Sequence, residues 1–174
     1  MNSSIWKTAS ACCVAVALTA CAASRNGGTT GISSLPAAVL KTGQYCAPAS
    51  DSWKATWISS PGALRSKIAQ CGANRVGAAA GSVPEIDYSR YGVLVVEMGR
   101  RRSGGYGFDP ERVTVRVTGR TAVVGLGIRQ PAEDALVTQE LTAPWIMIQT
   151  PRGEYRNIRV VDQHARPLTE IELP

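Results

Sequence analysis

The chain has 174 residues and carries 19 lysines and arginines against 13 aspartates and glutamates, so its formal net charge is +6. This length suits one domain around a single hydrophobic core rather than several domains. The chain has one histidine, His164, which excludes a zinc site built mainly on histidine.

The first segment of the chain, residues 1–20, has the features of an export signal. Lys7 supplies a positive charge, and residues 11–20 form a short apolar core typical of a signal peptide. That core is shorter than the roughly 20 apolar residues that span a bilayer. It ends in LTAC (18–21), which resembles a bacterial lipobox. The sequence therefore predicts a lipoprotein that is cleaved before Cys21 and acylated there with lipid such as palmitate. An ordinary signal peptide with a nearby cysteine is the alternative.

The residues after this cleavage site indicate a location in the bacterial cell envelope. A lipid on Cys21 would attach the protein to a membrane without spanning it. Ala22 is not acidic, which resembles the default that directs lipoproteins to the outer membrane. We therefore expect the protein at the periplasmic face of that membrane. Nucleic acid is not routinely present there, so we expect no nucleic-acid partner and attribute the positive charge to coding bias and to attraction by anionic surfaces.

The composition of the mature chain divides it into a tether and a domain. Residues 21–43 are mainly small and polar, which predicts a flexible tether. Residues 44–174 are expected to form one folded domain. Its two cysteines, Cys46 and Cys71, are an even pair in an oxidising compartment, so we expect them to form a disulfide.

One helix is expected near the start of the domain, within residues 58–72. Ser60 is a typical N-cap, Pro61 suits the first helical position and Gly72 suits the C-terminal end. An apolar stripe at helical spacing is formed by Leu64, Ile68 and Cys71.

Strands are expected to make up the rest of the domain. Residues 91–99 contain four consecutive apolar residues, which favours a strand buried on both faces. Alternating or apolar segments bounded by turn residues predict further strands at 112–119, 121–128, 136–139, 143–151, 154–162 and 167–174. The expected fold is α+β: a mainly antiparallel sheet of about six strands with one N-terminal helix packed on it.

The chemistry-bearing residues do not assemble into a recognisable catalytic motif. Asp162 and His164 lie two residues apart in an expected turn, but no G-x-S-x-G motif accompanies them. The arginine- and glycine-rich stretch GRRRSGGYGF (99–108) lacks the spacing and the lysine of a P-loop. We therefore expect no catalytic residues, no metal and no cofactor. Judged from its local sequence alone, this stretch is either a solvated turn or an interface loop.

Two segments together resemble the protease complex subunit PrcB family. The first is VPEIDYSRYGVLVVEMGRRRSGGYGF (83–108), and the second is PAEDALVTQELTAPWIMIQTP (131–151). The matching positions are Pro84, Asp87, Tyr88, Ser89, Gly99, Arg101, Ser103, Gly104, Gly105 and Tyr106 in the first, and Pro131, Val137, Thr138, Gln139, Leu141, Thr142, Pro144 and Pro151 in the second.

The resemblance implies a subunit without catalytic residues that binds or stabilises a partner protein, with a secreted or surface protease as a candidate partner. The residues expected to form its recognition surface, or the turns that shape it, are Arg101, Ser103, Gly104, Gly105, Tyr106, Thr138, Gln139 and Trp145.

Two alternatives to this function remain at the level of sequence. The SGGYG letters (103–107) approximate the loop of chagasin-type protease inhibitors, which predicts an inhibitory wedge. A small hydrolase could instead use two carboxylates held across a cleft, although no pair stands out in the sequence.

Overall fold

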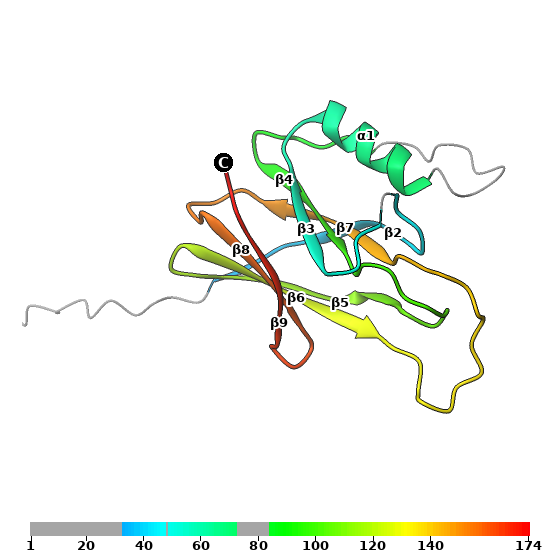
Figure 1. The fold of residues 1–174 in the computed structure, drawn as a ribbon. Helices are drawn as coiled ribbons and strands as arrows, with labels where there is room; N and C mark the ends of the chain where they lie inside the picture. Colours follow the sequence, from blue (N-terminus) through cyan, green and yellow to red (C-terminus); the bar gives the residue numbers. More distant parts are fainter. Residues whose placement is uncertain (1–32, 48, 73–83) are drawn as a thin grey trace, which may run out of the picture.

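The computed structural model describes residues 33–47, 49–72 and 84–174, and these fold into two packed sheets with one helix (Figure 1). The helix covers the outer face of one sheet, and the two sheets face each other across the main hydrophobic core. The described part of the chain therefore has three layers: helix, four-stranded sheet and five-stranded sheet.

The four-stranded sheet forms the middle layer and is antiparallel throughout. Its strand order is β2 (Ala38–Gly43), β7 (Trp145–Pro151), β4 (Tyr91–Glu97) and β3 (Lys54–Ile58). In β4, Leu94 and Val96 point into the core between the sheets, whereas Val93 and Val95 pack with the helix. The expectation of a strand buried on both faces is therefore confirmed.

The five-stranded sheet closes the other side of the core. Its order is β1 (Ser33–Leu35), β5 (Gly107–Thr118), β6 (Thr121–Arg129), β8 (Asn157–Asp162) and β9 (Pro167–Glu172). All its pairings are antiparallel except that of β6 with β8. The alternating apolar residues of β5 and β6 face the core, as their period of two predicts.

Helix α1 (Pro61–Gly72) begins and ends where the capping residues predict. The Ser60 hydroxyl accepts a hydrogen bond from the Ala63 N–H, at 3.3 Å, in the N-cap arrangement. The buried stripe consists of Leu64, Ile68 and Cys71. The helix thus buries the face that its sequence indicates.

Three expectations about the fold differ from the structure. The described residues form nine strands rather than about six, and these strands make two sheets rather than one. Residues 136–139 lie in a connection without strand structure. Residues 33–43, assigned to the tether, form β1 and β2, because their apolar side chains pack on the core once β5 and β7 pair with them. The expected signal peptide and Cys21 lie outside the described residues.

The expected disulfide is present and links two layers of the domain. Cys46 follows β2, Cys71 lies in the last turn of α1, and the two sulfurs are 2.00 Å apart. The Ala47 N–H also donates to the Gln70 carbonyl at 3.2 Å. The end of the helix is thereby tied to the segment that follows β2.

Removing this disulfide should lower the stability of the folded protein. The bond spans 25 residues of chain, and closing such a loop stabilises by about 3 kcal/mol in the chain-entropy model. We expect Cys46→Ser/Cys71→Ser to lower the free energy of unfolding by about that amount in urea titrations. Adding a thiol reductant should have a similar effect on the wild type and none on the variant. Equal stability of the oxidised wild type and the variant would contradict the prediction.

Candidate functional site

Connections from distant parts of the chain meet at one end of the sandwich (Figure 1). The β4–β5 connection runs beside the β6–β7 connection. Arg101 and Thr142 exchange two main-chain hydrogen bonds of 2.8 and 2.9 Å, and the Gly104 N–H donates to the Thr138 carbonyl at 2.9 Å. The Thr142 hydroxyl also donates to the Ser103 carbonyl at 3.1 Å. The two segments singled out by the sequence are therefore bound to each other.

Two glycines allow this close approach of the connections. A side chain at Gly104 would overlap the hydroxyl group of Thr138. Gly105 has a φ of 85°, and a Cβ there would lie 3.0 Å from the Pro131 ring and 3.3 Å from Val137. Both the positive φ and the lack of space favour glycine at these positions.

An arginine lies close to two aromatic rings under the β4–β5 connection. The guanidinium carbon of Arg101 is 5.7 Å from the ring centroid of Trp53 and 5.8 Å from that of Tyr106. Trp53 in turn makes an edge-to-face contact with Phe108, with centroids 6.0 Å apart. Because both rings are partly buried against the core, they hold the arginine in place while it stays partly exposed.

The neighbouring arginine is held by a carboxylate. Arg100 donates two hydrogen bonds to the Asp51 carboxylate, of 2.6 and 2.8 Å. These bonds, together with the arginine's positive charge, lower the pKa of Asp51. Both side chains are exposed, so the pair orients Arg100 more than it stabilises the fold.

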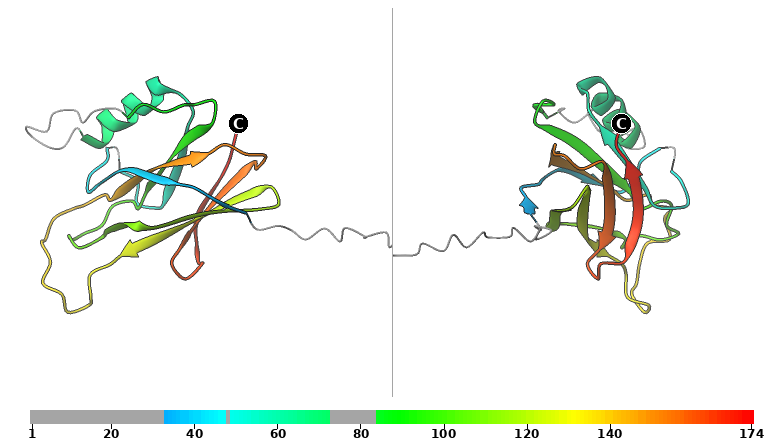
Figure 2. Two further views of the ribbon diagram at one scale, coloured as in Figure 1. Left: turned by 180° about the vertical axis from the view of Figure 1, so that it is seen from behind. Right: turned by 90° about the vertical axis from the view of Figure 1, so that its left-hand side faces the viewer.

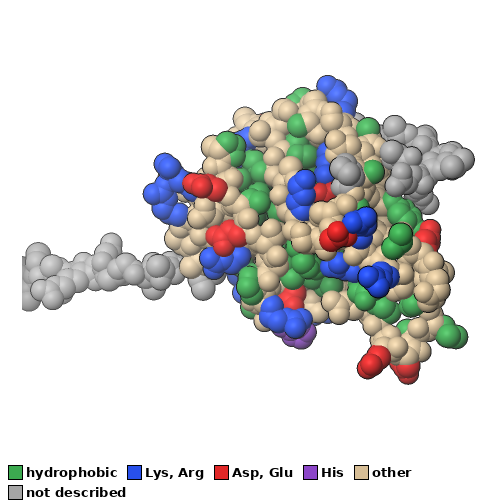
Figure 3. All heavy atoms as spheres, in the orientation of Figure 1, with side chains coloured by type: hydrophobic (Ala, Val, Ile, Leu, Met, Phe, Trp, Pro, Cys, Tyr) green, Lys and Arg blue, Asp and Glu red, His purple; other side chains and the backbone are tan. Residues whose placement is uncertain are grey.

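The β6–β7 connection projects beyond the strands and carries apolar side chains in solvent (Figure 2). Leu136 is 104% exposed and Leu141 is 66% exposed, and these are the exposed large hydrophobic residues among those that the structure describes. Acidic and hydrophobic side chains gather on this connection in Figure 3. We use the name loop surface for seven of the exposed residues of the two connections: Arg100, Arg102, Leu136, Thr138, Gln139, Glu140 and Leu141.

The position of Trp145 corrects one expectation. Its side chain is 3% exposed and belongs to the core under α1. The indole N–H donates to the Tyr45 carbonyl at 2.8 Å, and the ring packs against Gly43. Trp145 is therefore not part of a recognition surface, because the β2 strand covers it. Of the other expected residues, Thr138 and Gln139 are exposed, whereas Arg101, Ser103 and Tyr106 are partly buried.

Asp162, the acidic residue of the expected turn, stabilises the turn between β8 and β9 through hydrogen bonds. Its Oδ1 accepts hydrogen bonds from the N–H groups of His164 and Arg166, at 2.8 and 2.9 Å. Its Oδ2 lies 2.6 Å from Arg166 Nε. Burial acts to raise the pKa of Asp162, but the hydrogen bonds from Arg166 and His164 together lower it. The carboxylate is thus engaged by the turn.

A second buried group of ionisable residues surrounds the disulfide. The Cys46 and Cys71 sulfurs and a Glu97 carboxylate oxygen lie within 4.8 Å of one another. The sulfurs are bonded to each other, and Glu97 pairs with Lys67 at 2.7 Å. In this state the group offers no thiolate to a metal ion.

Comparison with known proteins identifies the segment that carries the loop surface. Residues 93–151 match the family model described as PrcB C-terminal. This segment of the chain is therefore similar to the C-terminal part of the PrcB family. The matched range runs from within β4 to the end of β7 and contains both connections. Searches of curated proteins and of solved structures gave no match.

The structure shows two features of the domain that sequence patterns alone did not single out. Leu136 and Leu141 are exposed although their types favour burial, and Trp53 contacts Arg101 from a distant segment. The sequence of residues 136–139 predicted a strand, in which we would expect Leu136 to be buried. No helix among the described residues is long and apolar enough to cross a membrane.

A substitution at Gly105 should loosen the contact between the two connections. Gly105→Ala is expected to cost about 1–2 kcal/mol from its left-handed φ, and it also meets Pro131 and Val137. Gly119 is the matched control, because its φ is 58° but nothing lies within 4 Å of its Cβ position. Both variants should unfold at lower urea concentration, but only Gly105→Ala should speed hydrogen exchange at the Gly104 amide. Equal exchange in both variants would contradict this account.

The Asp162 carboxylate should make the fold sensitive to acid. Because its folded pKa is lowered, its contribution is present above the unfolded pKa of about 3.9 and disappears as pH falls through the folded value. We expect Asp162→Asn to lose about 1–2 kcal/mol at neutral pH and to show a shallower decline of stability in acid. Urea titrations at several pH values measure both effects. Parallel pH curves for variant and wild type would show that the turn does not depend on the charge.

Proposed function

We propose that this chain is a non-catalytic, lipid-anchored envelope protein that binds or stabilises a partner protein, a secreted or surface protease, through the loop surface. The single observation that carries the proposal is that the PrcB C-terminal match contains both connections, and that these are hydrogen-bonded into one surface. The anchor is the lipid on Cys21, and the protein faces the periplasm from the outer membrane.

The composition of the loop surface suits protein recognition. Leu136 and Leu141 expose apolar area that a partner can remove from water. Arg100 is held by Asp51, and Arg101, which lies beside the loop surface, is held by aromatic rings, so little side-chain freedom is lost when a partner contacts them. Acidic residues nearby, such as Glu140, add charges of the opposite sign that can set the orientation of a partner.

The other chemistry of the domain supports a non-catalytic role. The Asp162 carboxylate is engaged by the β8–β9 turn, and Glu97 is paired with Lys67. Three hollows among the described residues are each lined by at most one side-chain carboxylate. A hydrolase that works through two carboxylates across a cleft gains no support from this arrangement.

A protease inhibitor is the second candidate, because the β6–β7 connection extends beyond the sheets (Figure 2). Its Leu136 side chain is fully exposed. Such a segment has the shape of a wedge that could enter a protease cleft. A subunit leaves the activity of its protease intact or raises it, whereas an inhibitor lowers it. Measuring activity of the recovered protease with and without this protein separates the two.

The loop surface is tested by crosslinking and recovery from intact cell envelopes. We expect Leu136→Ser/Leu141→Ser to reduce recovery of the partner at least about tenfold, since two apolar contacts are lost. Arg116→Ser is the matched control, because Arg116 is exposed on β5 away from the connections and should recover the partner normally.

A Cys21→Ser arm of the same experiment tests the anchor separately. This variant should leave the membrane fraction but still bind the partner once the two are mixed. Undiminished recovery with the double leucine variant would refute the loop surface as the binding site. Membrane association of Cys21→Ser equal to that of the wild type would refute the lipid anchor.

A further inference from the structure

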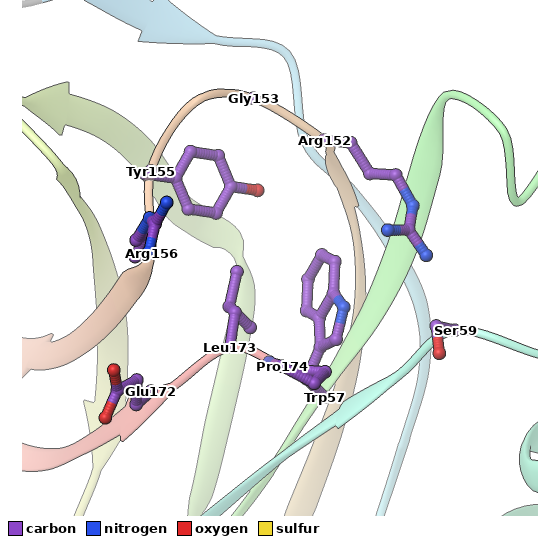
Figure 4. A pocket seen from close by; sticks show the side chains of 9 residues that line it. All are labelled: Trp57, Ser59, Arg152, Gly153, Tyr155, Arg156, Glu172, Leu173 and Pro174. Carbon is purple, nitrogen blue, oxygen red and sulfur yellow. The ribbon is translucent and has the colours of Figure 1, made fainter.

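A hollow lies near the start of β4, whereas the loop surface follows the end of that strand. Figure 4 shows the side chains that line it. Its volume is about 470 Å³, which falls within the range of small-ligand sites. The residues around it come from the end of β3, the β7–β8 connection and the chain beyond β9: Trp57, Ser59, Arg152, Gly153, Tyr155, Arg156, Glu172, Leu173 and Pro174. Nothing in the proposed function uses this hollow.

The apolar side chains of the hollow are held by contacts with their neighbours. The Trp57 ring covers Gly92 so closely that any side chain at position 92 would overlap it, which fixes the ring. Tyr155 is 4% exposed and its hydroxyl donates to the Pro151 carbonyl. The Leu173 N–H donates to the Arg156 carbonyl at 2.7 Å, which holds Leu173 between the two rings in Figure 4. These contacts hold the apolar wall of the hollow in place.

One arginine at the rim is oriented but has no anionic partner. Arg152 Nε donates to the Tyr91 carbonyl at 3.3 Å, and its terminal nitrogens make no hydrogen bond with any residue that the structure describes. Such a guanidinium offers two parallel donors that match a carboxylate. Burial raises the pKa of the adjacent Tyr155 to about 12, and the charge of Arg152 lowers it in part. The tyrosine thus stays neutral and adds no negative charge to the hollow at neutral pH.

The acidic residues nearby do not neutralise this arginine. Glu172 lines the hollow but lies on the far side of Leu173 from Trp57 in Figure 4. Glu154 lines an adjoining hollow. Neither forms an ion pair with Arg152 or Arg156 in the described part of the chain. An unpaired guanidinium beside a hollow with an apolar wall on one side favours a ligand that joins an apolar group to a carboxylate.

We propose that this hollow binds the C-terminal end of a peptide chain, with the free carboxylate on Arg152 and an apolar last side chain against Trp57 and Leu173. Arg156 supplies a second positive charge at the rim. The site lies next to Tyr91 at the start of β4, whereas the loop surface follows the end of that strand. Seven residues of strand span roughly 20 Å, so both sites can be occupied at once, and this proposal stands independently of the proposed function.

The proposal is tested by calorimetric titration of the full-length protein, purified from envelopes in detergent. The probe is an acetylated tripeptide that ends in leucine with a free carboxylate, and the comparison ligand is the same peptide as its C-terminal amide. We expect the acid to bind at least about tenfold more tightly than the amide, because only the acid can form the charged pair. Arg152→Gln should remove that preference, and Arg116→Gln, at an exposed site elsewhere, should retain it.

Two further arms make the result decisive. Trp57→Phe keeps an aromatic ring over Gly92, so the protein should stay folded. Its affinity for the peptide acid should fall severalfold. Free acetate should compete poorly, because it lacks the apolar group. Equal binding of acid and amide, a preference that survives Arg152→Gln, or binding of a neutral disaccharide in place of the peptide would each overturn the proposal.

Discussion

The burial of the four-stranded sheet on both faces is the constraint on which the rest of this structure depends. β4 supplies one apolar residue after another, and successive side chains enter opposite layers: Leu94 and Val96 contact the five-stranded sheet, Val93 and Val95 contact the helix side. A strand surrounded in this way cannot shift by one residue, because every side chain would then face the wrong layer. Its two ends are thereby fixed in space.

Those fixed ends determine where the two candidate sites form. The chain that leaves β4 must bend at once, and Gly99, with a φ of 80°, Gly104 and Gly105 allow it to run against the β6–β7 connection. At the start of the same strand, Gly92 leaves space for Trp57, which forms one wall of the hollow proposed to bind a peptide C-terminus. The glycines near both ends of β4 thus allow other segments to pack closely there, and this packing forms the two candidate sites.

The helix side of the sheet is secured by covalent and ionic contacts as well as by packing. The Cys46–Cys71 disulfide fixes the end of α1, and the buried Lys67–Glu97 pair joins the helix to the end of β4. An ion pair in this setting contributes less to stability than its distance suggests, because both charges lose water. Removing one partner would leave the other charge buried, so the pair fixes how the helix sits on the sheet.

The sequence by itself determined the elements whose signals are local. The caps at Ser60 and Gly72 and the apolar stripe located the helix, and the apolar run in β4 indicated a strand buried on both faces. The two cysteines expected to remain after signal cleavage indicated the disulfide, and the Gly-Gly bend and the Thr-Gln letters pointed to the two connections that lie side by side. Only the tertiary structure decided which segments pair with a strand and which side chains are covered by another segment. β1 and β2 became strands because they pair with β5 and β7. Residues 136–139 lie in a connection, where the Thr138 carbonyl bonds the Gly104 N–H. Trp145 was buried because it packs against β2. Edge pairing and burial depend on segments far apart in the chain, which local composition does not encode.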